Sequence, residues 1–275
     1  MKKGKLIKRL LIGIVLIPVL LIGAVSVYAY FHQDEIIQGQ IASLNEDYAG
    51  HISAGDTHLQ LFSNFPMISF KIDDVQVLED KSEDAPTIVK VKDIVASFNL
   101  MDIIKGNYDI QSILLEEGEF NLVLHEDGSI NLTNALSTGE ETTDESSPLA
   151  IHLKRIEMRE LDIHKLDEET KTDVEAYIYD GVGSFQTQDG VINAHLDSNF
   201  LLNIVNDGDT TYVHHKHFDV HTDLSFDENS GMLVIEPSDI KMENGDFKIE
   251  GSVDTKNDVD VDIEISGEKP NFDLF

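Results

Sequence analysis

The architecture of this chain is clearest in the stretch Phe218-Asp-Val-His-Thr-Asp-Leu-Ser-Phe226, in which apolar and polar residues alternate. The same alternation occupies Asp258-Val-Asp-Val-Asp-Ile-Glu-Ile265. Successive side chains of a β-strand point to opposite faces, so each stretch predicts a strand with one apolar and one charged face. Such stretches are separated by turn-forming pairs, namely Asp127-Gly128, Asp189-Gly190, Asp207-Gly208 and Asn244-Gly245. The sequence therefore predicts a mainly β protein.

The predicted strands have few helices to cover them. After residue 50 the only further helical pattern lies at Leu100 to Lys105. An amphipathic sheet has to hide its apolar face from water. The pattern is compatible with a β-sandwich, in which two sheets enclose a dry core, with a sheet closed on itself, or with an elongated, curled antiparallel sheet that forms a repeating β-groove. The alternation of residues does not by itself distinguish these architectures.

Acidic residues dominate the composition. The 275 residues include 52 Asp and Glu against 20 Lys and Arg, which gives a net charge of −32. This charge excludes nucleic acid as a general partner and disfavours docking of the body on anionic membrane surfaces. Because the chain contains no cysteine, it forms no disulfide, thiolate zinc site or cysteine nucleophile.

Residues 10–31 form an uncharged apolar run, LLIGIVLIPVLLIGAVSVYAYF. At about 1.5 Å per residue the run spans roughly 33 Å, enough to cross the core of a bilayer. Bases crowd residues 1–9, whereas the acids Asp34 and Glu35 follow the run. The positive-inside rule therefore predicts a cytoplasmic basic tip at 1–9, a single transmembrane helix at 10–31, and a body on the non-cytoplasmic side of the membrane. The alternative is a signal peptide cleaved after Ala29, and the body is exported in either case.

The exported body divides into four segments. In residues 32–49 an apolar stripe predicts an amphipathic helix, and it consists of Ile37, Ile41, Leu44 and Tyr48. Residues 50–136 and 149–275 are predicted to be two β lobes, with an acidic linker or loop at 137–148. We expect the second lobe to continue the sheet of the first.

A weak repeat supports a continuous sheet. Ile113-Leu-Leu-Glu-Glu-Gly-Glu-Phe120 resembles Ile240-Lys-Met-Glu-Asn-Gly-Asp-Phe247 and, more loosely, Ile156-Glu-Met-Arg-Glu-Leu-Asp-Ile163. Each unit predicts a strand, a polar break suited to a turn or bulge, and a new strand.

One histidine-rich strand provides the only metal candidates, His215, His217 and His221. On a strand these side chains share a face, and histidines at i and i+2 can share Zn²⁺ or Cu²⁺. We favour the alternative of a solvated polar face without metal, because no local loop supplies supporting ligands. The nucleotide-binding, serine-hydrolase and zinc-protease motifs are absent. We therefore expect no cofactor, no catalytic residue and no enzymatic activity.

Two segments have the character of a known protein family. Phe98-Asn-Leu-Met-Asp-Ile-Ile-Lys-Gly106 looks like that family's strand, short helix and glycine, and Asp127-Gly-Ser-Ile-Asn131 looks like the end of a family strand. Together with the membrane span and short helix before them, they resemble the N-terminal region of the AsmA family of bacterial envelope proteins. The resemblance implies an inner-membrane anchor and a periplasmic β-groove that handles lipid or helps to build the outer membrane. Family members are usually longer, which leaves open a truncation at Phe275.

An apolar groove of this kind would take the acyl chains of phospholipids. Burying a methylene is worth roughly 0.8 kcal/mol, so a long acyl chain gains on the order of 10 kcal/mol. The candidate lipid-facing residues are Phe218, Val220, Leu224, Phe226, Val259, Val261, Ile263 and Ile265. The alternative function is a membrane-anchored β-sandwich scaffold that binds envelope proteins without lipid.

Overall fold

The structure, a computed structural model, describes most of the predicted body. The described residues are 31, 34–35, 37–39, 41–64, 67–82, 84–104, 110–137, 154–188, 190–206, 210–255 and 260–268. None of the helices in these ranges is long and apolar enough to cross a membrane. The predicted basic tip at 1–9, span at 10–31 and linker at 137–148 lie outside the described residues, apart from Phe31 and Ser137.

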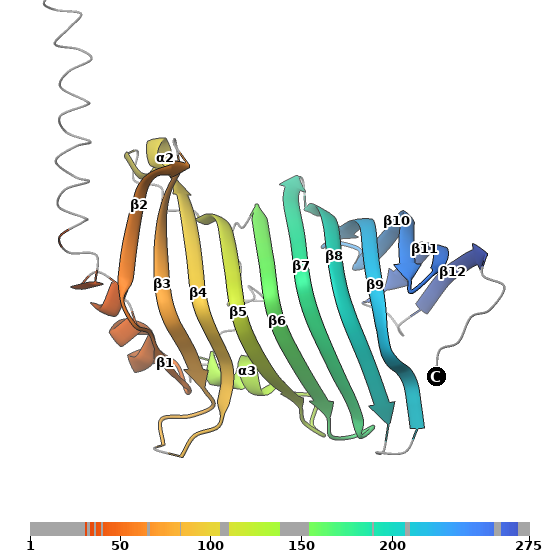
Figure 1. Ribbon diagram of the computed structural model, residues 1–275, viewed down its shortest axis with the longest axis horizontal. Coiled ribbons are helices and arrows are strands. Elements are labelled where there is room, and N and C mark those ends of the chain that lie inside the picture. Colours follow the sequence, from red (N-terminus) through yellow and green to blue (C-terminus); the bar gives the residue numbers. More distant parts are fainter. Residues whose placement is uncertain are drawn as a thin grey trace, which may run out of the picture.

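Twelve strands form one open sheet, in which almost every strand pairs with its neighbours in the chain (Figure 1). β1 (His51–Ser53) and β2 (Thr57–Asn64) both pair with β3 at one end of the sheet. From there the order is β3 (Met67–Leu78), β4 (Thr87–Asn99), β5 (Ile110–Leu124), β6 (Arg155–Asp167), β7 (Thr172–Gln188), β8 (Val191–Asn206), β9 (Thr210–Asp227), β10 (Met232–Met242), β11 (Gly245–Asp254) and β12 (Asp260–Glu268). The mainly β prediction is confirmed, and the described strands form a single sheet rather than the two packed sheets of the sandwich alternative.

One strand pair departs from the predicted antiparallel arrangement. β5 and β6 run parallel, with Ile113 beside Ile156 and Leu124 beside Asp167. Parallel neighbours require the chain to return along the sheet before the next strand begins. The segment between these two strands makes that return, and it includes α3 (Asn131–Ala135). The two predicted lobes therefore join edge to edge in one sheet.

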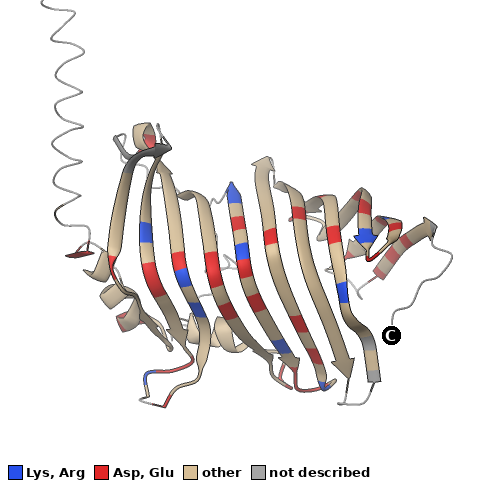
Figure 2. Cartoon of the chain, in the orientation of Figure 1, with Lys and Arg blue, Asp and Glu red and all other residues tan. Residues whose placement is uncertain are grey.

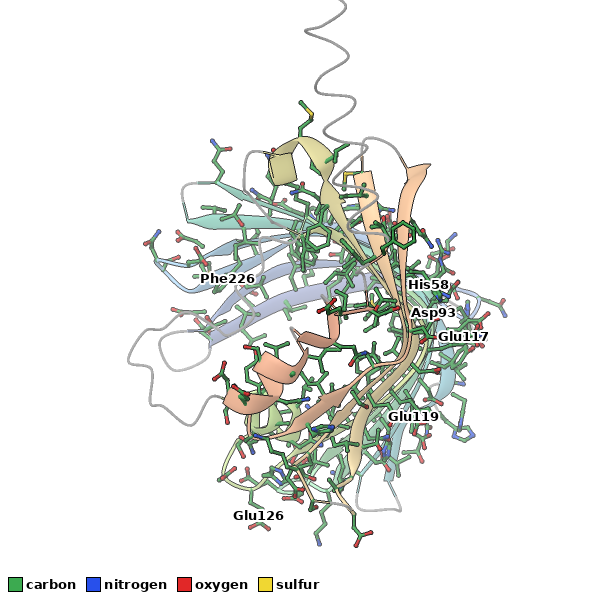
Figure 3. The ribbon with its side chains drawn as sticks, turned by 90° about the vertical axis from the view of Figure 1, so that its left-hand side faces the viewer. His58, Asp93, Glu117, Glu119, Glu126 and Phe226 are labelled. Atoms are coloured by element: carbon green, nitrogen blue, oxygen red, sulfur yellow. The ribbon has the colours of Figure 1, made fainter. Side chains whose placement is uncertain are left out.

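A line of backbone kinks crosses the middle of the sheet. Asp74 in β3, Glu117 in β5 and Glu160 in β6 have left-handed backbone conformations, with φ angles of 51°, 53° and 52°. The register aligns these kinks, since Glu116 pairs with Arg159 and Glu117 therefore lies beside Glu160. Local departures of this kind bend a strand and increase its twist. Seen from its end, the sheet is strongly curled (Figure 3).

Each kink shifts the alternation of side chains by one residue. Leu115 and Phe120 of β5 are five positions apart, so strict alternation would place them on opposite faces. Both nevertheless pack against one buried cluster, which consists of Ile88, Val89, Val91 and Ala135. We call the face that carries this cluster the concave face. The acids of the kinked segments lie on the opposite, convex face, where Figure 3 shows Asp93, Glu117 and Glu119.

The kinks explain the repeat in the sequence and correct one part of its interpretation. In β5 and β6 the polar break is a kink within a single long strand, so no new strand begins there. In the third copy the break is the hairpin turn between β10 and β11, at Glu243 and Asn244. Glu243 has a φ of 53°, so this break also contains a left-handed residue, one position earlier in the repeat unit than Glu117 and Glu160.

Among the described residues, short helices cover the first part of the concave face. Ala135 of α3 belongs to the buried cluster, and Leu132 packs against it. Residues 41–47 are helical, as the apolar stripe predicts, but Tyr48 lies beyond the helix and Leu44 is 37% exposed. The predicted helix after β4 is confirmed as α2 (Leu100–Ile104), whereas α3 was not predicted.

Gly50 joins the N-terminal segment to α3. Its backbone N–H donates to the carbonyl oxygen of Ala135 at 2.7 Å. A Cβ at this position would lie 2.6 Å from the carbonyl oxygen of Leu78 and 2.8 Å from Cβ of Ala135. Only glycine allows this close approach, which holds the N-terminal segment against the β3–β5 end of the sheet.

Candidate functional site: the concave face

The concave face continues across the second half of the sheet as an apolar surface. The register places Ile178 of β7 beside Phe200 of β8, and Phe200 beside Phe218 of β9. The rings of Phe200 and Phe218 stack with their centroids 5.2 Å apart and an interplanar angle of 9°. Phe218 in turn pairs with Met242 of β10. One apolar row thus connects four neighbouring strands.

This apolar surface is largely open to solvent. From β6 to β12 the only buried apolar side chains among the described residues are Leu161, Ile178 and Met242. The apolar concave side chains of β8 and β9 are half-buried, whereas the polar Ser198 and Thr222 are buried. On β12 Val261 is 54% exposed and Ile265 is 65% exposed. Such a surface contrasts with a packed sandwich core, in which both faces of the interior exclude water.

The structure brings most of the predicted lipid-facing residues to this one surface. Phe218, Val220, Leu224 and Phe226 lie on the concave face of β9, beside apolar residues of β10. Val261, Ile263 and Ile265 share that face on β12, beside Val253, Gly251 and Ile249 of β11. Val259 lies outside the described residues.

Other strands contribute residues that the sequence analysis did not select. On β8 the concave residues are Ile192, Ala194, Leu196, Ser198, Phe200, Leu202 and Ile204. The alternation of β8 could have identified them. On β10 Ile240 and Met242 were placed in the repeat unit, where their role in the apolar surface was not recognised.

The three candidate metal-binding histidines contact different partners. His217 hydrogen-bonds Asn199 at 2.9 Å, and His221 contacts Asp197 and Asp219. His215 has a left-handed φ of 46° at an irregularity in the β8–β9 pairing, and it contacts His214. The described residues contain no group of three or more His, Cys, Asp or Glu side chains arranged to hold a metal ion.

A network of histidines and aspartates connects β8 and β9 on the convex face. Nδ1 of His195 lies 2.7 Å from Asp223 and Nε2 lies 2.9 Å from Asp197. Asp197 also contacts His221, which lies 3.1 Å from Asp219. Hydrogen bonds to Asp223 and Asp197 raise the pKa of His195, and the bond to Asp197 raises the pKa of His221. The network connects β8 and β9 through side chains on the protein surface.

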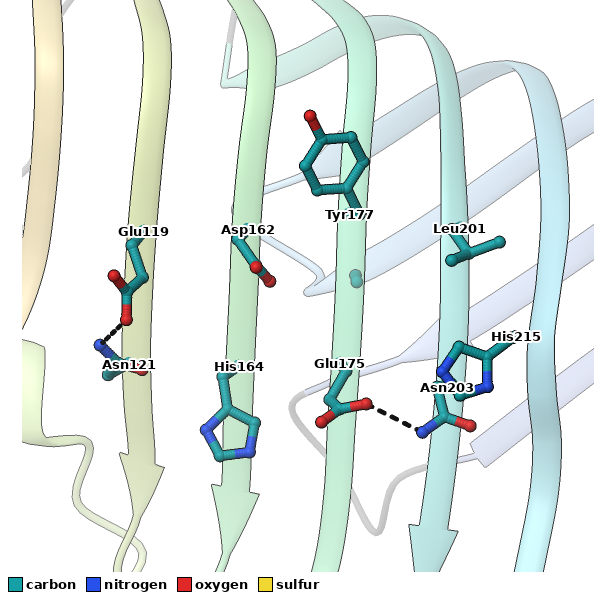
Figure 4. A pocket seen from close by; sticks show the side chains of 10 residues that line it. Glu119, Asn121, Asp162, His164, Glu175, Tyr177, Leu201, Asn203 and His215 are labelled. Carbon is teal, nitrogen blue, oxygen red and sulfur yellow. Dashed lines mark hydrogen bonds between the residues drawn. The ribbon is translucent and has the colours of Figure 1, made fainter.

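A shallow pocket of about 420 Å³ lies on the same convex face (Figure 4). Its polar lining comes from neighbouring strands: Glu119, Asn121, Asp162, His164, Glu175, Tyr177, Asn203 and His215. Several of these side chains satisfy one another, since Asn121 donates to Glu119 at 3.0 Å and Asn203 donates to Glu175 at 2.9 Å. This pocket is a polar depression on the convex face.

Charge is therefore segregated between the two faces of the sheet. Figure 2 shows acidic and basic residues along the strands, and the ion pairs that connect them belong to the convex face. Lys71 contacts Asp93 at 2.8 Å, and Lys92 contacts Glu117 at 2.5 Å. These side chains are partly exposed, so solvent screens the ion pairs and each pair contributes little to stability. Their main consequence is a convex face that stays in water and a concave face that is left apolar.

A single curled sheet with a charged convex face and an apolar, half-exposed concave face defines the class of β-groove proteins. The sequence model of the AsmA family matches residues 1–200 of this chain. The chain belongs to the AsmA family, as its element order indicated. A search of curated proteins finds no match to the chain.

Proposed function

We propose that this protein is a non-catalytic, inner-membrane-anchored β-groove whose periplasmic concave face binds or transfers phospholipid acyl chains during envelope and outer-membrane biogenesis. The observation that carries the proposal is the half-exposed apolar surface that runs from β6 to β12. Membership of the AsmA family suggests a role in the envelope. The anchor at 10–31, with a cytoplasmic N-terminus, is part of the proposal.

The energetics favour an acyl chain as the occupant. Leaving apolar side chains in contact with water is unfavourable by roughly 25 cal/mol for each Å² of exposed apolar surface. A flexible acyl chain can follow a curved surface and cover such a row without supplying hydrogen bonds. The convex face offers no equivalent surface, because its acids and bases are hydrated or paired.

A photoreactive amino acid placed at single positions tests the proposal. We expect lipid adducts when the probe replaces Leu224 in β9 or Ile263 in β12, because both face the concave side. The matched controls are Asp223 and Asp262, which neighbour these positions and face the convex side. Mass spectrometry of the full chain, extracted from membranes after irradiation, identifies the adducts.

The pattern of adducts separates the possible results. Lipid captured from positions 224 and 263 but not from 223 and 262 supports a lipid-lined groove. Equal capture from both faces would show only that the body lies near a membrane. Protein adducts without lipid at the concave positions would favour the scaffold function instead.

A further inference from the structure

Two lysines interrupt the apolar concave face. Lys165 of β6 pairs with Leu122 of β5 and with Val174 of β7, which are both apolar. Lys216 of β9 pairs with Leu202, two positions before the stacked ring of Phe218. Both side chains are half-buried. The register therefore places two cations within an apolar surface.

Acids are sparse on the same surface. Every Asp and Glu that is paired in the register of β7 to β12 lies on the convex face, for example Asp197, Asp223 and Asp262. On β6 the nearest acid to Lys165 on its own face is Asp167, at the end of the strand, which accepts hydrogen bonds from the backbone N–H groups of Glu169 and Thr170 in the following turn. Asp167 also interacts electrostatically with Lys165, without forming an ion pair with it. The net charge of the chain is −32, but this face carries few of the acidic side chains.

Neither lysine forms an ion pair with a described residue. The convex lysines Lys71 and Lys92 contact carboxylates at 2.8 Å and 2.5 Å, whereas no such contact is present for Lys165 or Lys216 within the described part of the chain. A lysine stem packs well on apolar surface while its ammonium group seeks a hydrated or anionic partner. The two ammonium groups are therefore available to a ligand in the groove.

The spacing suits an amphiphile with one anionic headgroup. Lys165 and Lys216 lie three strands apart, which corresponds to roughly 14 Å at the usual spacing between strands. Their long flexible stems can bring both ammonium groups to one phosphate from opposite sides. Apolar residues lie between and beside them, among them Ala176 and Leu202.

We infer that Lys165 and Lys216 form a headgroup site within the groove, which selects phospholipids that carry a net negative charge over zwitterionic ones. This inference rests on the proposed lipid-binding function and adds to it a preference for one class of headgroup. The apolar face holds the acyl chains, and the two lysines hold the phosphate of the headgroup.

Labelling with two photoactivatable lipids tests the site. The full chain in detergent micelles is irradiated with phosphatidylglycerol or phosphatidylcholine, each with a diazirine in its acyl chain. We expect phosphatidylglycerol to label the wild-type protein at least about threefold more than phosphatidylcholine, the size expected for partly hydrated ion pairs. The double variant Lys165→Met with Lys216→Met keeps the stems and should label equally with both lipids. Lys248→Met is the control, since Lys248 is exposed on the convex face of β11.

The outcomes separate the inference from the proposed function. Strong labelling by both lipids without preference in the wild type would overturn the headgroup site but leave the groove intact. No labelling by either lipid would overturn the groove and the site together. Loss of the preference in Lys248→Met would assign it to general surface charge. Millimolar inorganic phosphate should leave the preference unchanged, and its disappearance would indicate a site for a free anion.

Discussion

At the scale of single residues, His195 shows how charge is arranged on the convex face. Both nitrogens of its ring face carboxylates, at 2.7 Å from Asp223 and 2.9 Å from Asp197. Both nitrogens can donate only when the ring is protonated. The raised pKa of His195 therefore reflects first its hydrogen bond to Asp223 and then the one to Asp197.

The first prediction concerns this histidine. Asp223→Asn should lower the pKa of His195 toward its ordinary value of about 6.5 and change the pKa of His221 less, because His221 is held first by Asp197. NMR titration of the two rings measures both effects. An unchanged titration of His195 would show that the contact does not persist in solution.

The same network has a defined pH window. A raised histidine pKa contributes stability that is present below about pH 6.5 and is lost as the pH rises through the folded-state pKa. The pKa of Asp197 is lowered, chiefly by its hydrogen bond to His221, so its contribution is lost as the pH falls through that lowered value. The histidine–aspartate network therefore stabilises the pairing of β8 with β9 most in mildly acidic solution. Since the side chain of His195 is 46% exposed, the effect on the free energy of unfolding is small, on the order of a few tenths of a kcal/mol.

At the scale of elements, the kinks in β3, β5 and β6 determine which side chains reach the groove. Glu160 lies at such a kink, with a φ of 52°, and is exposed. A non-glycine residue in this conformation carries a strain of roughly 1 kcal/mol. The kink keeps both Met158 and Leu161 on the concave side, although they are three positions apart. Without it, half of β6 would present its charged face to the groove.

The second prediction tests this kink with glycine. Glu160→Gly should keep or raise the free energy of unfolding, by up to about 1 kcal/mol, because glycine relieves the strain. Asp162→Gly, two residues along the same strand on the exposed face, should lower it by roughly 0.5–1 kcal/mol, since glycine weakens an ordinary strand. Urea denaturation of the two variants gives the comparison. Equal losses at both positions would show that residue 160 does not need a left-handed conformation.

At the scale of the whole molecule, the curl and the segregation of charge together create the groove. One face carries the ion pairs and the other carries the rows that connect Ile178, Phe200, Phe218 and Met242. The acids that give the chain its net charge of −32 keep the convex side hydrated. In the proposed function the body has to be held where lipid can enter the groove, so the proposed anchor at 10–31 is part of that function.

The third prediction concerns topology. We expect residues 32–275 to be exported and to remain attached to the inner membrane, because bases precede the uncharged run at 10–31 and acids follow it. Protease added to intact spheroplasts should digest the body while a cytoplasmic marker protein survives. Protection of the body would reverse the orientation, and a mature N-terminus at Tyr30 would show cleavage of a signal peptide.

The sequence by itself determined the strand content, the presence of an amphipathic sheet and the residues of β9 and β12 that share its apolar face. These follow from alternation, which is a local property of consecutive residues. The family resemblance also rested on the order of local elements, and it was correct. The sequence further located the polar breaks of the repeat, such as Glu116-Glu117.

Only the tertiary structure decided what those breaks do and what the strands enclose. A pair of polar residues looks the same whether the chain kinks within β5 or turns between β10 and β11, because the difference depends on the neighbouring strand. The parallel pairing of β5 with β6 likewise depends on a return of the chain that no local pattern encodes. Lys165 and Lys216 lie 51 positions apart in the sequence, and only the register of four adjacent strands places them on the same face. Contacts between distant segments arise from cooperative packing of the whole sheet, so they become visible only when the sheet is assembled.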